Sequence, residues 1–246
     1  MADNDLAGRT ALLTGASGGI GGALGERLVA AGVRVAFTYG AHSEQAERLV
    51  SLARSAGVDA LALGADLADP DTPARLVEQV TAQLGPVDVL IPNAGTATML
   101  EYADVDLATW DDTLAVNLRA PFLLAQAVLP GMVERGHGRV LFMSSVAAFT
   151  GGMIGPHYAA SKAGLHGLVH FLAARVAAHG VTVNALAPAL VEDTRMFPGA
   201  GPDVPIRIPV GRYGRPEEVA DLAMAVLGNG YLTSQVIGLD GGAYPR

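Results

Sequence analysis

The stretch TALLTGASGGIGGALGERLVAAG, Thr10 to Gly32, decides the fold of this chain. A short apolar strand, a glycine-rich turn and an amphipathic helix follow one another directly in it. Gly15, Gly19 and Gly21 permit a tight turn, a close approach of the backbone to a pyrophosphate and packing of the helix against a sheet. The helix N-terminus would attract that anion without a basic side chain. The segment therefore predicts a dinucleotide site, and a glycine turn without a ligand is the alternative.

Short β-rich runs alternate with helical patterns along the rest of the chain. Most of the runs are apolar at both odd and even positions, as in strands covered on both faces. They span residues 10–14, 33–39, 60–64, 87–92, 138–144, 182–187 and 236–239. The helical patterns span residues 21–31, 43–56, 72–84, 107–135, 158–178 and 216–227. This alternation predicts an α/β fold with a single domain over residues 1–246, a doubly wound (Rossmann) parallel seven-stranded sheet with helices on both faces.

Composition and charge narrow the class of protein. The 246 residues include no cysteine, which excludes disulfide scaffolds, cysteine nucleophiles and thiol-bound zinc or haem. The net charge of −8 predicts that neither nucleic acid nor an anionic membrane is a partner. The polar start MADNDLAGRT lacks the pattern of a signal peptide, and the apolar stretch over residues 115–133 is interrupted by polar residues and prolines. We therefore expect a cytoplasmic protein without a membrane span.

The end of the second predicted strand bears on the choice between NAD and NADP. A carboxylate there would bond the ribose 2′-hydroxyl of NAD and repel the 2′-phosphate of NADP. The chain has Tyr39 at this position and no carboxylate before Glu44, so NADP(H) is favoured and NAD(H) is the alternative. Neither the glycine turn nor residues 39–43 contain Arg or Lys, which leaves His42 and Ser43 as phosphate partners. An exposed loop is the alternative for His42.

A tyrosine and a lysine lie one helical turn apart in SSVAAFTGGMIGPHYAASK, Ser144 to Lys162. Their spacing places both on one helix face, where the ammonium of Lys162 would lower the pKa of Tyr158 and make it usable for proton transfer. Ser145 follows a predicted strand, and its hydroxyl would lie at the edge of the sheet where such folds bind ligands. An amphipathic surface turn is the alternative for the Tyr–Lys pair.

Serine hydrolysis is a rival interpretation of Ser145, with His137, His157 or His166 as the base. No G-x-S-x-G elbow surrounds this serine, and the glycine turn that opens the sheet belongs to nucleotide binding. Both observations disfavour a hydrolase.

Further motifs occur in a fixed order along the chain. They are TGASGGIG from Thr14, Asp66 and Leu67 in GADLAD, NAG at 93–95, Asn117 in AVNLRAPF, Ser145, YAASK at 158–162, NALAPALVEDT at 184–194 and the closing GLDGG. Each motif is modest alone, but their order and spacing are highly specific. Over essentially all of its length the chain resembles the short-chain dehydrogenase/reductase family, and it is closest in pattern to bacterial 3-oxoacyl-[acyl-carrier-protein] reductases.

The resemblance implies a catalytic tetrad of Asn117, Ser145, Tyr158 and Lys162. Tyr158 would be the general acid/base that protonates a carbonyl oxygen as hydride arrives, and Ser145 would orient that oxygen. Lys162 would lower the pKa of Tyr158 and bond the nicotinamide ribose, while Asn117 would anchor a water in a proton relay. Without the family, Asn117 would be interpreted as a helix residue that bonds its own turn.

Together, the glycine turn, the second strand and the resemblance predict a set of cofactor-binding residues. They are Gly15, Ser17, Gly18, Gly19, Ile20, Gly21, Tyr39, His42, Ser43, Asp66, Leu67, Asn93, Ala94, Gly95, Tyr158, Lys162, Pro188, Val191 and Thr194. Asp66 and Asn93 have turn formation as the alternative. Two departures from the family pattern are Gly18, where NADP-preferring members often have a basic residue, and Ala189, where glycine is common.

The predicted substrate pocket is mostly apolar and fits an alkyl, acyl or aromatic ketone better than a sugar or a charged acid. Its candidates are Ala147, Met153, His157, Met196 and Phe197, with Met99, Phe149 and Ile154 in addition. Core packing is the alternative for the Met and Phe residues. In the resembled family the segment corresponding to residues 194–212 is the substrate lid, and here it is short and rich in proline, so we expect an open pocket. No His or carboxylate cluster has metal-ligand spacing, so no metal is expected.

The predicted helices over residues 107–135 and 158–178 are apolar on more than one face, which the sheet alone would not cover. In the resembled family these helices pair across a dyad, so we expect a homotetramer. The mean hydropathy of +0.35 agrees with such burial, although a thick monomeric core or an alanine-rich chain would give a similar pattern.

Three hypotheses of function follow from these residues. The first is an NADP(H)-preferring carbonyl reductase that acts on a small-molecule ketone or acyl thioester of 3-oxoacyl or related apolar type. The second is an NAD-dependent alcohol or hydroxysteroid-type dehydrogenase. The third, a non-catalytic nucleotide-sensing protein, is disfavoured because all four tetrad positions are occupied.

Overall fold

A parallel sheet runs through the centre of the computed structural model, which describes residues 6–194 and 208–244. Its seven strands lie in the order β3-β2-β1-β4-β5-β6-β7, and every neighbouring pair is parallel. The strands are β1 (Thr10–Leu13), β2 (Arg34–Tyr39), β3 (Ala60–Gly64), β4 (Val89–Ile91), β5 (Gly138–Met143), β6 (Val181–Pro188) and β7 (Val236–Leu239). The strand order reverses between β1 and β4, as in a doubly wound sheet. The predicted fold class is confirmed.

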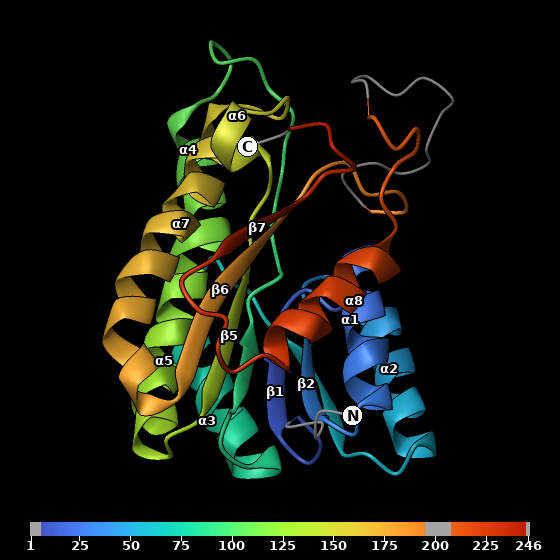
Figure 1. Cartoon of the computed structure of the whole chain (residues 1–246). Coiled ribbons are helices and arrows are strands. Elements are labelled where there is room, and N and C mark those ends of the chain that lie inside the picture. Colours follow the sequence, from blue (N-terminus) through green and yellow to red (C-terminus); the bar gives the residue numbers. More distant parts are fainter. Residues whose placement is uncertain (1–5, 195–207, 245–246) are drawn as a thin grey trace.

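Helices cover both faces of the sheet (Figure 1). One face carries α1 (Gly19–Ala30), α2 (Glu44–Ser55) and α8 (Pro216–Leu227). The other carries α3 (Thr72–Leu84), α5 (Ala120–Glu134) and α7 (Pro156–Val176). Within β1, Ala11 and Leu13 pack into the first layer and Leu12 into the second, because successive strand residues point to opposite faces. This two-sided burial explains why the strands are apolar at both odd and even positions.

The helix predicted over residues 107–135 is divided in the structure. α4 (Leu107–Leu114) passes into a π-helical turn, η1 (Ala115–Arg119), and then into α5. A π turn carries one extra residue in its backbone ring and is frequent at functional sites. The side chain of Asn117 lies inside this turn and is fully buried. The π turn therefore accompanies a buried Asn117 side-chain amide, at a place where a regular helix was predicted.

The continuous helical stretch Leu107–Glu134 is long and apolar enough to cross a membrane by length and composition alone. In this structure 44% of its most apolar window is buried. Leu124 and Val128 pack in the core layer that also contains Phe142 of β5. Part of the apolar surface of this stretch is thus buried against the sheet.

Further differences from the predicted elements concern α7 and the segment after β5. α7 begins two residues before Tyr158 and ends in a short 3₁₀ turn, η2 (Ala177–His179). A one-turn helix, α6 (Ala147–Thr150), follows β5 and was not predicted. Of the predicted lid over residues 194–212, the structure describes Thr194 and residues 208–212.

Candidate functional site

A cavity of about 780 Å³ opens along the carboxyl edge of the sheet. The segments that follow β1 to β6 line it: the glycine turn and residues 39–40, 65–67, 93–97, 143–147 and 188–191. The cavity spans the reversal of strand order between β1 and β4, which is where doubly wound sheets bind ligands. Segments far apart in the sequence therefore meet in one cleft.

The glycine turn is packed so closely that side chains are excluded at three positions. A Cβ on Gly21 would lie 2.2 Å from the carbonyl oxygen of Gly15, and one on Gly19 would lie 2.4 Å from that of Asp193. Gly15 has a φ of +71°, and a Cβ there would lie 2.7 Å from Cα of Ala94. No side chain caps the N-terminus of α1. This uncapped helix N-terminus fits the pyrophosphate of a dinucleotide.

Asn93 joins the glycine turn to the end of β4. Its Nδ2 donates to the carbonyl oxygens of Thr14, at 3.0 Å, and Gly15, at 3.1 Å. In return, Oγ1 of Thr14 accepts hydrogen bonds from the backbone N–H groups of Asn93, at 3.1 Å, and Ala94, at 3.0 Å. Asn93 is thus more than a turn former, because it holds two walls of the cleft together.

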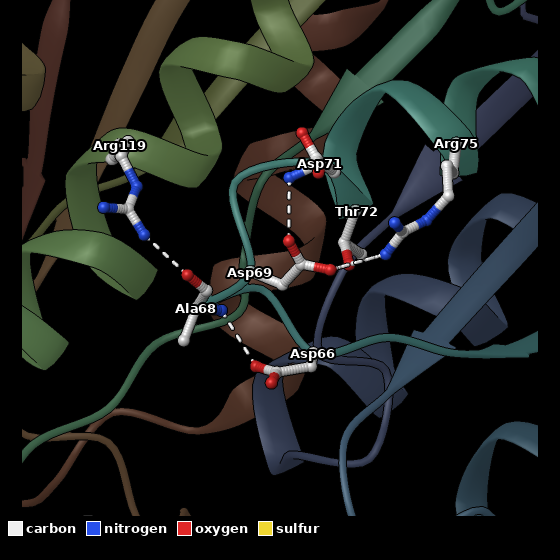
Figure 2. Close-up of polar contacts among 7 residues, drawn as sticks. All are labelled: Asp66, Ala68, Asp69, Asp71, Thr72, Arg75 and Arg119. Carbon is white, nitrogen blue, oxygen red and sulfur yellow. Dashed lines mark hydrogen bonds and ion pairs between the residues drawn. The ribbon is translucent and has the colours of Figure 1, made fainter.

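The loop after β3 is held by a polar network, shown in Figure 2. Oδ1 of Asp66 accepts a hydrogen bond from the N–H of Ala68 at 2.9 Å, and Arg119 of η1 donates to the carbonyl oxygen of Ala68. Oδ2 of Asp69 accepts from Arg75 at 2.6 Å. Asp66 is therefore both a turn former and a residue of the cavity lining. The bond from Arg119 ties this loop to the turn that contains Asn117.

Tyr158 and Lys162 lie on one face of α7, are both almost fully buried, and line the cavity with Ser145. Nζ of Lys162 lies 5.7 Å from the centroid of the Tyr158 ring and donates to the carbonyl oxygen of Met143 at 2.9 Å. The hydroxyl of Tyr158 is hydrogen-bonded to Ser145. The structure thus brings three of the four predicted tetrad residues to one wall of the cleft.

Burial shifts the pKa values of two side chains in this wall. Burial raises the pKa of Tyr158, and the hydrogen bond with Ser145 only partly offsets that effect. Burial also lowers the pKa of Lys162 from 10.5 to about 8. Lys162 is not among the causes of the Tyr158 shift, so its role in lowering the pKa of Tyr158 stays a prediction. The phenol is buried because it packs with the apolar side chains of Ala147 and Ile154, against which Ala97 also packs.

Asn117 lies behind the cavity wall. Its Oδ1 accepts from the N–H of Thr96 at 2.8 Å, while its Nδ2 donates to the carbonyl oxygen of Thr96 at 2.9 Å and to Oγ of Ser161 at 3.2 Å. A Cβ on Gly95 would lie 3.2 Å from Oδ1 of Asn117 and 3.5 Å from Nζ of Lys162. The absence of a side chain at Gly95 therefore leaves room for both polar groups. The role of Asn117 in a water relay stays a prediction.

Most of the predicted site residues line this single cavity. They are Gly15, Ser17, Gly18, Gly19, Ile20, Gly21, Tyr39, Asp66, Leu67, Asn93, Ala94, Gly95, Ser145, Ala147, Met153, Ile154, Tyr158, Lys162, Pro188, Val191 and Thr194. Met196 and Phe197 lie outside the described residues. Over residues 6–194 and 208–244, no group of three or more His, Asp or Glu residues is placed to hold a metal ion.

The other candidates lie apart from the cavity lining. His42 and Ser43 are not among its residues; Ser43 stands at the N-cap position of α2, where its side chain makes no capping hydrogen bond. Met99 and Phe149 are 62% and 42% exposed outside it. His157 is fully buried beside Tyr158, with its Nε2 3.1 Å from the carbonyl oxygen of Thr98.

Sequence reasoning missed several lining residues. Thr96, Ala97 and Thr150 come from irregular or single-turn segments, where no periodicity indicates a direction. Tyr244 lies near the end of the chain and lines the same cavity. Its only signal is its place five residues after β7, at the edge of the sheet where the site lies.

Comparisons with known proteins agree with this geometry. The family model described as short chain dehydrogenase matches residues 9–204. The acetoacetyl-CoA reductase of Cupriavidus necator is 35% identical over 242 residues, which cover 96% of this chain and 98% of that protein. The 3-oxoacyl-[acyl-carrier-protein] reductase FabG of Staphylococcus aureus is 33% identical over 241 residues, with 96% and 98% covered.

A solved structure extends the similarity to three dimensions. The blue fluorescent protein from a metagenomic library, crystallised in complex with NADPH, superposes with a TM-score of 0.91 and 36% sequence identity. The match covers 98% of this chain and 100% of that one.

Proposed function

Because this chain belongs to the short-chain dehydrogenase family and is an NAD(P)-dependent oxidoreductase, we propose that it is an NADP(H)-preferring carbonyl reductase. Its substrate would be a ketone of 3-oxoacyl or related apolar type. The observation that carries this proposal is the meeting of Ser145, Tyr158 and Lys162 with the glycine turn in one cavity. The names of the two curated relatives support it, since both describe reductases of acyl compounds with a ketone at the third carbon.

The cleft has the groups that a dinucleotide needs. The uncapped N-terminus of α1 would hold the pyrophosphate, Asp66 and Leu67 would contact the adenine, and Lys162 would bond the nicotinamide ribose. When bound, the cofactor supplies the hydride. The end of β2 has Tyr39 in place of a carboxylate, which favours NADP(H). The NADPH in the similar solved structure supports this choice.

The protein's own residues would handle the proton. Burial raises the pKa of Tyr158, so its phenol is protonated at neutral pH and is a donor for the substrate oxygen. Ser145, which is hydrogen-bonded to that phenol, would hold the same oxygen in place. Lys162, with a pKa of about 8, is charged at neutral pH and would stabilise the phenolate that remains after proton transfer.

The substrate would lie against the apolar part of the cavity lining. The lining includes Ala97, Ala147, Met153, Ile154 and Leu190. Such a surface fits an alkyl, acyl or aryl chain better than a sugar.

Turnover of a panel of β-ketoesters and aryl ketones with NADPH and with NADH tests the proposal. We expect a higher kcat/KM with NADPH, and Tyr158→Phe should abolish turnover while leaving NADPH binding largely unchanged. A higher kcat/KM with NADH would favour the NAD-dependent alcohol or hydroxysteroid-type dehydrogenase. NADPH binding without turnover of any ketone or alcohol would favour the nucleotide-sensing protein.

We also propose a cytoplasmic homotetramer. An apolar groove lies on the outer side of α4, η1, α5 and α7, lined in part by Leu114, Leu118, Phe122 and Leu168. Leu107 and Phe171 on the same helices are 74% and 55% exposed. Burial of this face between copies would account for its composition. Light scattering after size exclusion is expected to give the mass of four chains, and a monomer mass would contradict the assembly.

A further inference from the structure

His157 adjoins Tyr158 in the first turn of α7, yet it does not line the cavity. Its side chain is fully buried, and its Nε2 lies 3.1 Å from the carbonyl oxygen of Thr98. A carbonyl oxygen only accepts hydrogen bonds, so Nε2 must carry the hydrogen. Nδ1 is then the bare nitrogen, and within the part of the chain that the structure describes it is buried without a hydrogen-bond partner. The geometry thus places a hydrogen on Nε2.

The bond to Thr98 is the middle one of three contacts that hold the irregular segment after β4. On one side of it, Asn117 binds both the N–H and the carbonyl group of Thr96. On the other, the N–H of Leu100 donates to the carbonyl oxygen of Ile154 at 2.9 Å. The three contacts thus hold every second residue of the segment, at positions 96, 98 and 100. This segment forms no helix or strand, so these hydrogen bonds determine its shape.

Ala97, between the first two contacts, packs against the apolar cluster that contains Tyr158. It joins Ala147, Ile154 and Tyr158 in a small apolar cluster, and it lines the cavity. Movement of the Thr98 carbonyl would shift Ala97 and loosen one side of the Tyr158 ring. The histidine therefore acts on Ala97 only through the backbone, by its hydrogen bond to the next residue, Thr98.

Gly155 makes the position of the imidazole feasible. Its φ of +146° is rarely adopted by other residues, and a Cβ there would lie 2.7 Å from Cε1 of His157 and 2.8 Å from the carbonyl oxygen of Leu100. A side chain at Gly155 would therefore push on the imidazole and on the held segment together.

We propose that His157 is a positioning residue: by holding the Thr98 carbonyl it fixes Ala97 against Tyr158 and so sets the orientation of the phenol in the cavity. The kinetic part of this inference rests on the proposed reductase function. The structural part does not, because it concerns the tautomer of His157 and the packing of Tyr158.

Two amide substitutions test the hydrogen bond. In His157→Gln the side-chain nitrogen can reach the position of Nε2, whereas in His157→Asn the amide ends too early to reach Thr98. We expect His157→Asn to lower kcat about 10- to 100-fold, because small misplacements of reacting groups have effects of this size, and to leave the NADPH Kd within about twofold. His157→Gln should recover most of the lost kcat. His170→Asn is the matched control, since His170 is an exposed residue of the same helix.

A folded His157→Asn variant with the kcat of the wild type would overturn the proposal, as would equal losses in the Asn and Gln variants. If His157→Asn fails to fold, Gly155→Ala takes its place, with the same tenfold or greater loss of kcat expected.

Nuclear magnetic resonance gives a readout that does not depend on turnover. In the wild type the ring-nitrogen shifts of His157 should indicate the neutral tautomer with hydrogen on Nε2, and His157→Asn or Gly155→Ala should shift the ring resonances of Tyr158. Hydrogen on Nδ1, or unchanged Tyr158 resonances, would refute the positioning role. If the wild type turns over no ketone, the proposed function fails and these spectra still decide the role of His157.

Discussion

Replacing Lys162 by methionine should abolish activity and yet stabilise the protein. Burial lowers the pKa of this lysine from 10.5 to about 8, which means that the folded protein disfavours its charged form. With about 1.4 kcal/mol for each pKa unit, this shift corresponds to about 3 kcal/mol at neutral pH. Lys162→Met keeps an apolar side chain of similar length and removes the buried charge.

The loss of one hydrogen bond reduces this gain. Nζ of Lys162 donates to the carbonyl oxygen of Met143 at 2.9 Å. A hydrogen bond from a charged donor contributes about 2 kcal/mol, so the net stabilisation is about 1 kcal/mol. For a domain of this size that corresponds to a rise in Tm of about 2–4 °C. We expect kcat of the variant to be undetectable, since the charge that would stabilise the Tyr158 phenolate is gone.

The pH dependence of unfolding distinguishes this cause from better packing. Below pH 8 the folded and unfolded states both hold the lysine proton, so the wild type carries the full destabilisation. Between about pH 8 and 10.5 the unfolded state binds more protons, and the stability of the wild type should rise with pH. Lys162→Met should lack this rise.

Urea unfolding without cofactor, at pH 7.0 and at several values from 8 to 9.5, measures both effects. A variant less stable than the wild type at pH 7, or parallel stability profiles for the two proteins, would refute the reasoning.

Two further substitutions test the packing of the cleft. Gly21→Ala would bring a Cβ to 2.2 Å from the carbonyl oxygen of Gly15 and should lower stability by about 1–3 kcal/mol and abolish NADPH binding in calorimetry. Gly167→Ala, a helix position with nothing within 4 Å, is its control and should stabilise by about 0.5–1 kcal/mol. Asn117→Leu would leave the N–H and carbonyl groups of Thr96 unpaired and should destabilise by about 3 kcal/mol. Amide hydrogen exchange at Thr96 should accelerate in that variant. Unchanged exchange would show that the two hydrogen bonds between the Asn117 side chain and the Thr96 backbone do not stabilise this segment.

The sheet was predictable from the sequence because its strands are covered on both faces. β5 and β6 are buried at every position, so most of their residues are apolar without alternation, and the glycine turn marks the start of the first βα unit. The ends of strands were harder to predict: β4 has three residues, Val89–Ile91, where six were predicted. Strand ends depend on the hydrogen bonds of neighbouring strands, which a local pattern does not contain.

The site was predictable where residues share a helix face or follow a strand. Tyr158 and Lys162 were placed together by their spacing alone. His157 was assigned to the pocket, but its side chain lies elsewhere, because neighbouring residues on a helix do not share a face. The π turn around Asn117 was not predictable, because the contacts of its amide with Thr96 come from a separate segment.

The hydrogen bond from Arg119 to Ala68 affects how this protein could be re-engineered (Figure 2). Loops that line a cofactor cleft are natural units to transplant between relatives when a different binding preference is wanted. Here the loop at residues 66–72 is attached to the π turn, and the same turn carries Asn117. A transplanted loop with a different backbone path would lose the hydrogen bond from Arg119. It would also disturb the π turn and so the hydrogen bonds of Asn117 with Thr96. A working chimera therefore requires the loop and residues 115–119 to be exchanged together.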